Sequence, residues 1–374
     1  MPKVLYLITE LDVGGAEKNL FRLAAALKAR GWTVEVACLS GRGEVGNWFA
    51  AEGIRVRYAD MDFKASPAAF LRLVRIIRRA RPDVLHTFLF HANVAGRLAT
   101  IFARVPVVVS SIRVAERRRK SHLYFDRLTQ PLVDAEICVS QGVRDFTRER
   151  ARVREGKLVV IANPVDAPQP ARPRAETRAA LGARDDDVVI LSVGRLDVQK
   201  GYRYLVEAAA SLFASRRNLL FALAGEGMDR AAIEGSIGAA SIGDRFKLLG
   251  WRADVADLYA AADVFVLPSL WEGMANALLE AMAAGLACVA TDVEGSREVI
   301  EQGRTGLLVP PAHAQALAAA IASLADDRDA RARIGAAAKA EVLSSHDTAR
   351  FAAAHEDLYT RLLEEKCASR LTSG

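Results

Sequence analysis

The sequence predicts an α/β protein built from two doubly wound domains, each with a mostly parallel sheet. Short segments rich in β-branched residues alternate with longer helical segments along the chain, as in repeated βαβ units. The alternation breaks once, between residues 163 and 173, where four prolines exclude regular structure. A length of 374 residues is sufficient for two domains that each bury a core.

The first half of the chain begins with a strand and a helix that set the pattern. Leu20, Leu23 and Leu27 recur at helical spacing, and Gly31 follows as a C-terminal glycine, so we expect a helix over residues 15–30. The strands expected in this half are 4–9, 33–39, 55–58, 83–88, 106–112, 135–140 and 158–162.

A second series of the same kind follows the prolines and ends with an amphipathic tail. Its expected strands are 188–193, 219–224, 246–249, 264–268, 287–291 and 306–309. We therefore assign an N-terminal Rossmann-like domain to residues 1–163, a linker to 164–174 and a C-terminal Rossmann-like domain to 175–346. Residues 347–374 contain one more helix, expected over 347–365, and packing against the first domain is one arrangement open to it.

The composition excludes several protein classes. No apolar run approaches the roughly 20 residues that span a bilayer, and the first apolar stretch is too short for a signal peptide. The four cysteines are far apart and form no metal-ligand pattern, which is typical of reduced thiols in the cytoplasm. We expect a cytoplasmic protein without a bound metal.

Positive charge is concentrated in the first half. Residues 1–165 contain 28 Lys and Arg against 16 Asp and Glu, and the rest contains 23 against 29. Basic clusters at 72–81 and 113–120 suit binding of an anionic lipid, a phosphorylated acceptor or a nucleic acid. Solvent-exposed faces of Arg-rich helices produce the same pattern without any ligand. Nucleic acid is disfavoured because aromatic residues do not interleave with the basic ones.

Two glycines follow the first expected strand. Gly14 and Gly15 lie at the turn into the first helix, where backbone amides and the helix N-terminus favour an anion. Paired glycines can also simply permit the turn. The pattern is neither a dinucleotide-binding fingerprint nor a Walker A loop, which argues against NAD and ATP.

Two further loops follow strands of the second domain. Arg195 and Lys200 place two cations in one loop, as a diphosphate leaving group requires, unless they are ordinary side chains of an exposed turn. Gly225, Glu226 and Gly227 allow close backbone approach to a base or ribose, or form a tight turn.

The loop after the expected strand 264–268 is the most specific. Glu272 stands in the loop, Gly273 follows, and a helix begins whose first amides point back toward the loop. Glu280 comes eight residues later, so the two carboxylates lie about 10 Å apart along a helix. This separation suits two ends of one ligand better than one proton-transfer site. The neighbours of Glu280 are apolar, so its carboxylate needs a partner.

In this combination and order, these motifs resemble glycosyltransferase family 4, whose members are retaining enzymes of the GT-B fold. The resemblance covers nearly the whole chain. It implies two facing Rossmann-like domains with a deep interdomain cleft. It also implies a nucleotide diphosphate sugar as substrate, with no cofactor and no metal.

The resemblance assigns roles position by position. Arg195 and Lys200 hold the donor diphosphate and neutralise the leaving nucleotide, Glu272 addresses the donor sugar, and Glu280 accepts hydrogen bonds from the ribose. The remaining donor contacts it implies are Gly14, Gly15, Gly225, Glu226, Gly273, Met274, Ala275 and Asn276.

The chain departs from the family pattern where many relatives carry a histidine. Here residues 110–113 read Ser-Ser-Ile-Arg, so Arg113 is one replacement. His91, paired with Asn93, is the other candidate, and we include it among the catalytic residues. We also expect His86 to line the acceptor side of the cleft. Pro164 stands where relatives often have glycine, so the hinge turn differs.

The function expected is transfer of a sugar, most simply from a UDP-sugar, to a lipid-linked or polysaccharide acceptor in cell-surface glycan biosynthesis. The basic first domain adds peripheral contact with an anionic membrane, at the inner face. Two alternatives stay open: a sugar-nucleotide epimerase or phosphorylase on the same fold, and a non-catalytic nucleotide-sugar-binding protein.

Overall fold

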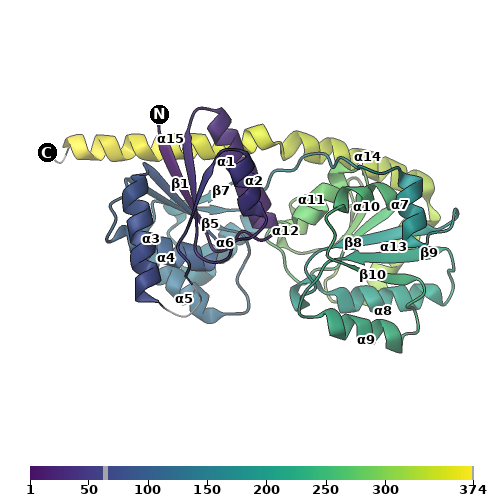
Figure 1. The fold of residues 1–374 in the computed structure, drawn as a ribbon. Helices are drawn as coiled ribbons and strands as arrows, with labels where there is room; N and C mark the ends of the chain where they lie inside the picture. Colours follow the sequence, from purple (N-terminus) through teal and green to yellow (C-terminus); the bar gives the residue numbers. More distant parts are fainter. Residues whose placement is uncertain (62–65, 373–374) are drawn as a thin grey trace. The chain divides into compact units, whose positions relative to one another are not determined.

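The chain folds into two compact α/β units. The computed structural model describes residues 1–61 and 66–372 (Figure 1). Unit 1 comprises Met1–Pro164 and Thr348–Gly374, and unit 2 comprises Val165–Asp347. The chain passes between them inside the segment of four prolines, which contains no helix or strand between residues 161 and 173. Residues 373–374 of the expected tail lie outside the described residues.

Unit 1 contains a seven-stranded parallel sheet in the order β3-β2-β1-β4-β5-β6-β7. Every strand predicted for this half of the chain is confirmed, with ends shifted by at most two residues. The strands are β1 Lys3–Ile8, β2 Thr33–Cys38, β3 Arg55–Tyr58, β4 Val84–Phe88, β5 Val107–Ile112, β6 Ala135–Cys138 and β7 Leu158–Val160.

Helices cover both faces of this sheet. They are α1 Gly15–Ala29, α2 Val45–Ala51, α3 Pro67–Ala80, α4 Phe90–Thr100, α5 Lys120–Thr129, α6 Gln141–Phe146 and α15 Thr348–Thr372. The boundaries of α3 follow from its sequence: the Ser66 hydroxyl accepts from the amide of Ala69, and Pro67 occupies the first turn. Arg81 ends the helix in the left-handed conformation.

Alternation along β1 divides the core of unit 1 into two layers. Val4, Tyr6 and Ile8 point into a layer shared with α1, α2 and α15, whereas Leu5 and Leu7 point into a layer shared with α3 and α4. All five side chains are fully buried. β1 therefore lies at the centre of the unit, as a nearly continuous apolar run predicts for a parallel strand.

The C-terminal helix α15 belongs to unit 1, against α1 and β5 (Figure 1). It is longer than predicted and extends to Thr372. Tyr359 and Leu362 enter the core, and the Trp32 indole donates to Glu356 at 2.9 Å. The last helix is thus an integral part of the first α/β unit.

Unit 2 contains a six-stranded parallel sheet in the order β10-β9-β8-β11-β12-β13. The strands predicted for this half are also confirmed: β8 Val188–Val193, β9 Leu219–Ala224, β10 Phe246–Gly250, β11 Val264–Leu267, β12 Ala287–Thr291 and β13 Leu307–Val309. The helices are α7 Arg174–Leu181, α8 Tyr202–Phe213, α9 Arg230–Ala239, α10 Val255–Ala261, α11 Asn276–Ala283, α12 Glu294–Arg297, α13 Ala314–Asp326 and α14 Arg328–Ser345.

The strand order of each sheet reverses once, between β1 and β4 in unit 1 and between β8 and β11 in unit 2. Loops that leave the carboxyl ends of two such strands diverge and form a crevice, where open α/β sheets bind ligands. The predicted motifs after β1, β4, β8 and β11 therefore sit at the two switch points. Within the described residues, no helix is long and apolar enough to cross a membrane.

Candidate active site

The switch point of unit 2 brings the loops after β8 and β11 into contact. Gly201 has a positive φ of +63°, and a side chain there would collide with the carbonyl oxygen of Pro268. The amide of Leu270 donates to the carbonyl of Gln199 at 2.7 Å, and the Gln199 side chain donates to Trp271 at 2.9 Å. These bonds hold the two loops in fixed register.

Lys200 and Glu272 meet across this contact. The Lys200 ammonium lies 2.5 Å from Oε1 of Glu272, and the Ser269 hydroxyl donates to the same oxygen at 2.6 Å. The Glu272 side chain is 6% exposed and that of Lys200 is 16% exposed. A buried carboxylate needs hydrogen-bond partners, and Glu272 has two of them on one oxygen, so its second oxygen has capacity for a ligand.

Arg195 lies in the same loop and is exposed. Among the residues that the structure describes, Arg195 has no ion-pair partner, unlike Lys200. The loop after β8 therefore presents one cation held by Glu272 and a second that faces solvent.

The loop after β9 packs directly on the loop after β8. A Cβ on Gly225 would collide with the carbonyl oxygen of Gly194, and one on Gly227 with that of Leu196. The close approach that these glycines permit is thus to a neighbouring loop, and contact with a base or ribose stays a prediction. The exposed Glu226 pairs with Arg230 at 2.5 Å.

Glu280 has the partner that its apolar neighbours require. The phenol of Tyr259, from α10, donates to Oε2 of Glu280 at 3.1 Å. Tyr259 is 2% exposed, and burial together with the adjacent carboxylate raises the pKa of its phenol far above the usual value. Tyr259 is therefore always a donor, and it fixes one Glu280 oxygen while the other is available to a ligand.

The start of α11 borders the same crevice. Ala275 is the N-cap residue and supplies no side-chain acceptor to the first turn of the helix. Glycine is required at position 295, at the start of α12, because a Cβ there would collide with the backbone carbonyl of Gly273. The segment Gly273, Met274, Ala275 and Asn276 is therefore enclosed by the loops after β11 and β12.

The corresponding turn in unit 1 is occupied by an acidic side chain. A Cβ on Gly14 would collide with the carboxyl oxygen of Glu17, which folds back over the turn before Gly15. Burial raises the pKa of Glu17 to about 7, partly opposed by the charge of Arg113. Arg113 is half-buried and donates to Asn163 at 2.5 Å, and burial lowers its pKa to about 10. An anion at this turn would meet both Glu17 and Arg113.

His86 does not line an acceptor site. It lies within β4 rather than at its end and is fully buried. One ring nitrogen contacts the Tyr359 hydroxyl at 2.5 Å and the other contacts Ser111 at 2.9 Å. Because both nitrogens are used inside the core, the expected acceptor role of His86 was wrong.

Asn93 is also structural, which corrects its expected pairing with His91. Its side chain is buried, accepts from Thr87 at 2.8 Å and donates to the carbonyl of Ser111 at 3.0 Å. Both ends of the amide are thus used to tie α4 to β4 and β5. Because Asn93 is only 3% exposed, it does not face an acceptor.

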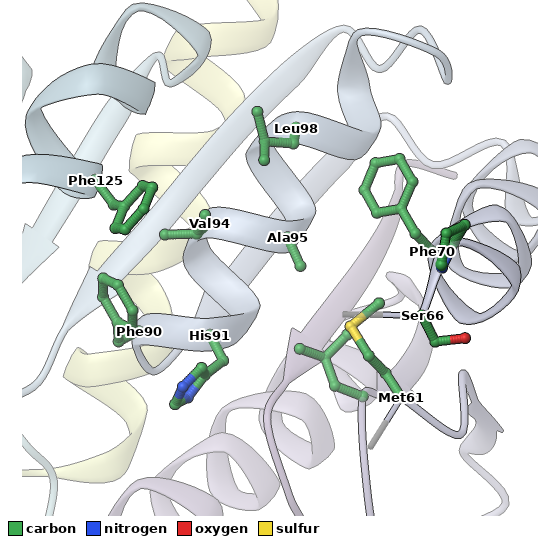
Figure 2. Close-up of a pocket in the computed structure, with 11 residues that line it drawn as sticks. Met61, Ser66, Phe70, Phe90, His91, Val94, Ala95, Leu98 and Phe125 are labelled. Carbon is green, nitrogen blue, oxygen red and sulfur yellow. The ribbon is translucent and has the colours of Figure 1, made fainter. Parts of the chain in front are cut away.

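His91 alone of this group reaches the surface. It is exposed in the first turn of α4, near Phe90 and His122. Partial burial, with positive charge from His122 and Arg119, lowers its pKa. A neutral imidazole at physiological pH is a competent proton acceptor. Figure 2 shows His91 at the edge of a pocket of unit 1.

Several residues of the crevice were not predicted from the sequence. Ser269 and Gln199 lie in the loops after β11 and β8, so their positions in the sequence could have identified them as site residues. Gly295 follows β12 and gave the same kind of signal. Tyr259 gave none, because an apolar or aromatic residue at helical spacing is typical of any core-facing helix. No group of His, Cys, Asp and Glu side chains in the described ranges could hold a metal ion.

Comparison with known families identifies both halves of the chain. Residues 173–341 match the family described as glycosyl transferases group 1, and residues 13–168 match glycosyltransferase family 4. The α-D-kanosaminyltransferase of Streptomyces kanamyceticus is 32% identical over 292 residues, which cover 72% of this chain and 75% of that protein.

Two further similarities concern a second relative and a solved structure. An Escherichia coli enzyme named UDP-Gal:α-D-GlcNAc-diphosphoundecaprenol α-1,3-galactosyltransferase is 28% identical over 273 residues, 70% of either chain. The crystal structure of HepE from Anabaena with UDP and glucose superposes with a TM-score of 0.87 at 23% identity, covering 96% of this chain and 100% of that chain. This superposition shows that the fold is GT-B.

Proposed function

The chain belongs to glycosyltransferase family 4 and is a glycosyltransferase, and from this premise we propose that it moves a sugar from a UDP-sugar, with retention of configuration, to a lipid-linked or glycan acceptor. The product belongs to a cell-surface glycan. The observation that carries the donor half of this proposal is the contact of Lys200, Ser269 and Glu272 at the switch point of unit 2.

The donor diphosphate is placed against Arg195 and Lys200. Departure of a nucleoside diphosphate leaves negative charge on its terminal phosphate, and fixed cations stabilise that charge most when they are already oriented. Lys200 is oriented by Glu272, and Arg195 is exposed beside it. The first amides of α11 add the positive end of a helix dipole.

The two carboxylates recognise opposite ends of the donor. Glu272, with the amides of Gly273, Met274 and Ala275, addresses the hydroxyls of the sugar. The free oxygen of Glu280 accepts from the ribose hydroxyls, while Tyr259 holds the other oxygen. Each carboxylate thus has one oxygen fixed by the protein and one offered to the ligand.

The choice of UDP rests on the named relatives. The Escherichia coli enzyme is named for a UDP-galactose donor, and the Anabaena protein was crystallised with UDP and glucose. The same Escherichia coli name specifies a diphosphoundecaprenol acceptor, which supports a lipid-linked acceptor here.

Retention follows when the acceptor hydroxyl attacks the face from which the diphosphate departs. In this reaction the bond from the anomeric carbon to the phosphate oxygen breaks, the bond to the acceptor oxygen forms, and the acceptor proton passes to the leaving phosphate. His91 is the side chain of unit 1 that we place on the acceptor, because its pKa is lowered and it is exposed.

We place the enzyme in the cytoplasm with peripheral contact to the membrane. Arg75 and Arg79 are exposed on α3, whose opposite face is buried in unit 1. Exposed basic side chains attract the anionic inner leaflet at roughly 1 kcal/mol each. This places unit 1 where a lipid-linked acceptor is found.

A nucleotide panel tests the donor site. Thermal unfolding is measured with UDP, GDP and ADP on wild type, on Glu280→Gln and on Glu207→Gln, an exposed glutamate of α8 used as a matched control. UDP at 100 times its Kd stabilises the protein by about 2.7 kcal/mol. We expect this stabilisation in wild type and Glu207→Gln and its loss in Glu280→Gln. An undiminished UDP shift in Glu280→Gln, or no shift with any nucleotide, would overturn the donor assignment.

A further inference from the structure

Unit 1 contains an apolar pocket that the donor chemistry does not use. It has a volume of about 500 Å³, which is within the range of small-molecule sites. Figure 2 shows Phe70 and Met61 on one side of α4 and Phe125 on the other. All the lining side chains are apolar except Ser66 and His91: Leu39, Met61, Ser66, Pro67, Phe70, Phe90, His91, Val94, Ala95, Leu98 and Phe125.

Large apolar side chains stay exposed around this pocket. Leu98 and Phe125 belong both to its lining and to this exposed set, so the two surfaces are continuous. Tyr124 is 63% exposed and Leu128 is 60% exposed. Contiguous exposed apolar surface marks a binding site for another molecule or a membrane. We call this set the apolar face: Leu71, Leu98, Ile101, Phe102, Tyr124, Phe125 and Leu128.

Positive charge lies at the edge of the pocket beside His91. Arg119 is exposed and close enough to His91 to lower the pKa of its imidazole. The backbone amide of Arg119 donates to Glu116 at 3.0 Å, the other carboxylate oxygen of Glu116 lies 3.1 Å from His122, and the His122 ring stacks on Phe90 of the pocket lining. The pocket therefore combines an apolar interior with an exposed basic residue in a segment that contacts its lining.

The helices that form the pocket are held together by a buried arginine. Arg97 is fully buried in α4, and its guanidinium donates to Ser110 of β5 at 3.0 Å and to Thr129 of α5 at 3.1 Å. It also pairs with Asp126 at 3.2 Å. Because α4 is anchored to both β5 and α5, the wall of the pocket that α4 and α5 form is held in place.

We propose that this pocket binds the hydrocarbon chain of a phosphorylated lipid acceptor, with its phosphate or diphosphate beside Arg119. This inference rests on the proposed function and specifies its acceptor as an amphiphile. An apolar lining binds a hydrocarbon chain but leaves a polyhydroxylated sugar without hydrogen-bond partners. Leu98 and Phe125, which belong both to the pocket lining and to the apolar face, join the pocket to exposed apolar surface.

The test uses farnesyl diphosphate as a water-soluble probe and inorganic diphosphate as its chainless counterpart. Affinities are measured by calorimetry on the full chain. In Val94→Trp the new indole fills the pocket from α4, and in Val160→Trp the same change is made at an exposed position on β7, outside it. Arg119→Gln removes the charge alone. UDP binding is measured in parallel on every protein.

We expect farnesyl diphosphate to bind wild type and Val160→Trp at least tenfold more tightly than inorganic diphosphate. Val94→Trp is expected to lose this difference, and Arg119→Gln to weaken both probes by a similar factor. Equal affinity for the two probes, or an undiminished difference in Val94→Trp, would overturn the pocket assignment.

The parallel UDP measurement separates the two proposals. If UDP binds but farnesyl diphosphate binds no more tightly than inorganic diphosphate, the pocket assignment is overturned and the donor site is supported. If farnesyl diphosphate binds more tightly than inorganic diphosphate but UDP does not bind, the donor assignment is overturned and the pocket is supported.

Discussion

The Lys200–Glu272 pair shows how two side chains can be held ready for an anionic substrate. An ion pair between buried groups is stable only when further hydrogen bonds satisfy both partners, and Ser269 supplies one of them. The pair keeps the ammonium in the crevice without burying an uncompensated charge. When a diphosphate arrives, Lys200 can contact it without leaving Glu272.

Removal of Lys200 is therefore expected to affect turnover more than folding. In Lys200→Ala we expect kcat to fall by on the order of 10²–10³, the effect of removing one donor to a developing charge. Lys200→Arg restores part of the loss because it keeps the charge. Steady-state kinetics measure the effect, and Lys339→Ala, at an exposed site on α14, is the control.

The kinetic split distinguishes this role from a purely structural one. A lysine that only supported the loop would change the unfolding temperature and KM, and Lys200→Arg would not recover turnover. Unchanged kcat in folded Lys200→Ala would exclude Lys200 from leaving-group stabilisation.

At the residue level, the sequence predicted positions better than contacts. Glu280 was predicted to need a partner because Leu279, Ala281 and Met282 are apolar, but nothing in the sequence pointed to Tyr259 on another helix. His86 was misplaced because its distance along β4 was misjudged. His86 lies in the middle of β4, inside the sheet, whereas only residues at or beyond the carboxyl end of the strand can face a ligand.

At the level of elements, α15 is the helix whose position depends most on tertiary packing. Its amphipathic pattern predicted a helix but not the surface that it covers, since many surfaces can accept one apolar stripe. In the structure its buried face carries His355 and Tyr359 against β4, where His86 is also fully buried. The ring centroids of His86 and His355 are thus 5.8 Å apart, and both side chains are buried in the core.

This packing predicts acid sensitivity of unit 1. Burial lowers the pKa of His355 from 6.5 to about 4, and burial lowers that of His86 as well. The unfolded chain therefore binds these protons first, so their contribution to stability is complete above about pH 6.5 and is lost as pH falls toward 4. The loss is up to about 3 kcal/mol for His355.

Thermal unfolding across this pH range measures the effect. We expect the melting temperature to fall less steeply between pH 7 and pH 4.5 in His355→Phe than in wild type. His313→Asn, which changes an exposed histidine and retains a capping side chain, should follow the wild-type slope. Parallel slopes for wild type and His355→Phe would contradict the buried-histidine explanation.

At the scale of the molecule, the sequence predicted the two parallel sheets because apolar, β-branched strands are distinctive. The handedness of βαβ connections constrains each crossover but does not give the order of strands, which the structure supplies. The sequence did not predict that Gly225 and Gly227 pack on a neighbouring loop, because glycines that allow close approach of a ligand have the same pattern. The pocket of unit 1 could not be predicted either, since its lining comes from α3, α4 and α5 together with the residue after β2 and the segment before α3.

We propose that this chain transfers a hexose from a UDP-hexose to a lipid-linked acceptor with retention. The most direct measurement is an NMR assignment of the anomeric proton in the product formed from an α-linked UDP-hexose and an isoprenoid diphosphate-linked sugar. We predict an α-linked product, formed faster than from the same sugar without its lipid. A β-linked product, or equal rates with the free sugar, would contradict the account.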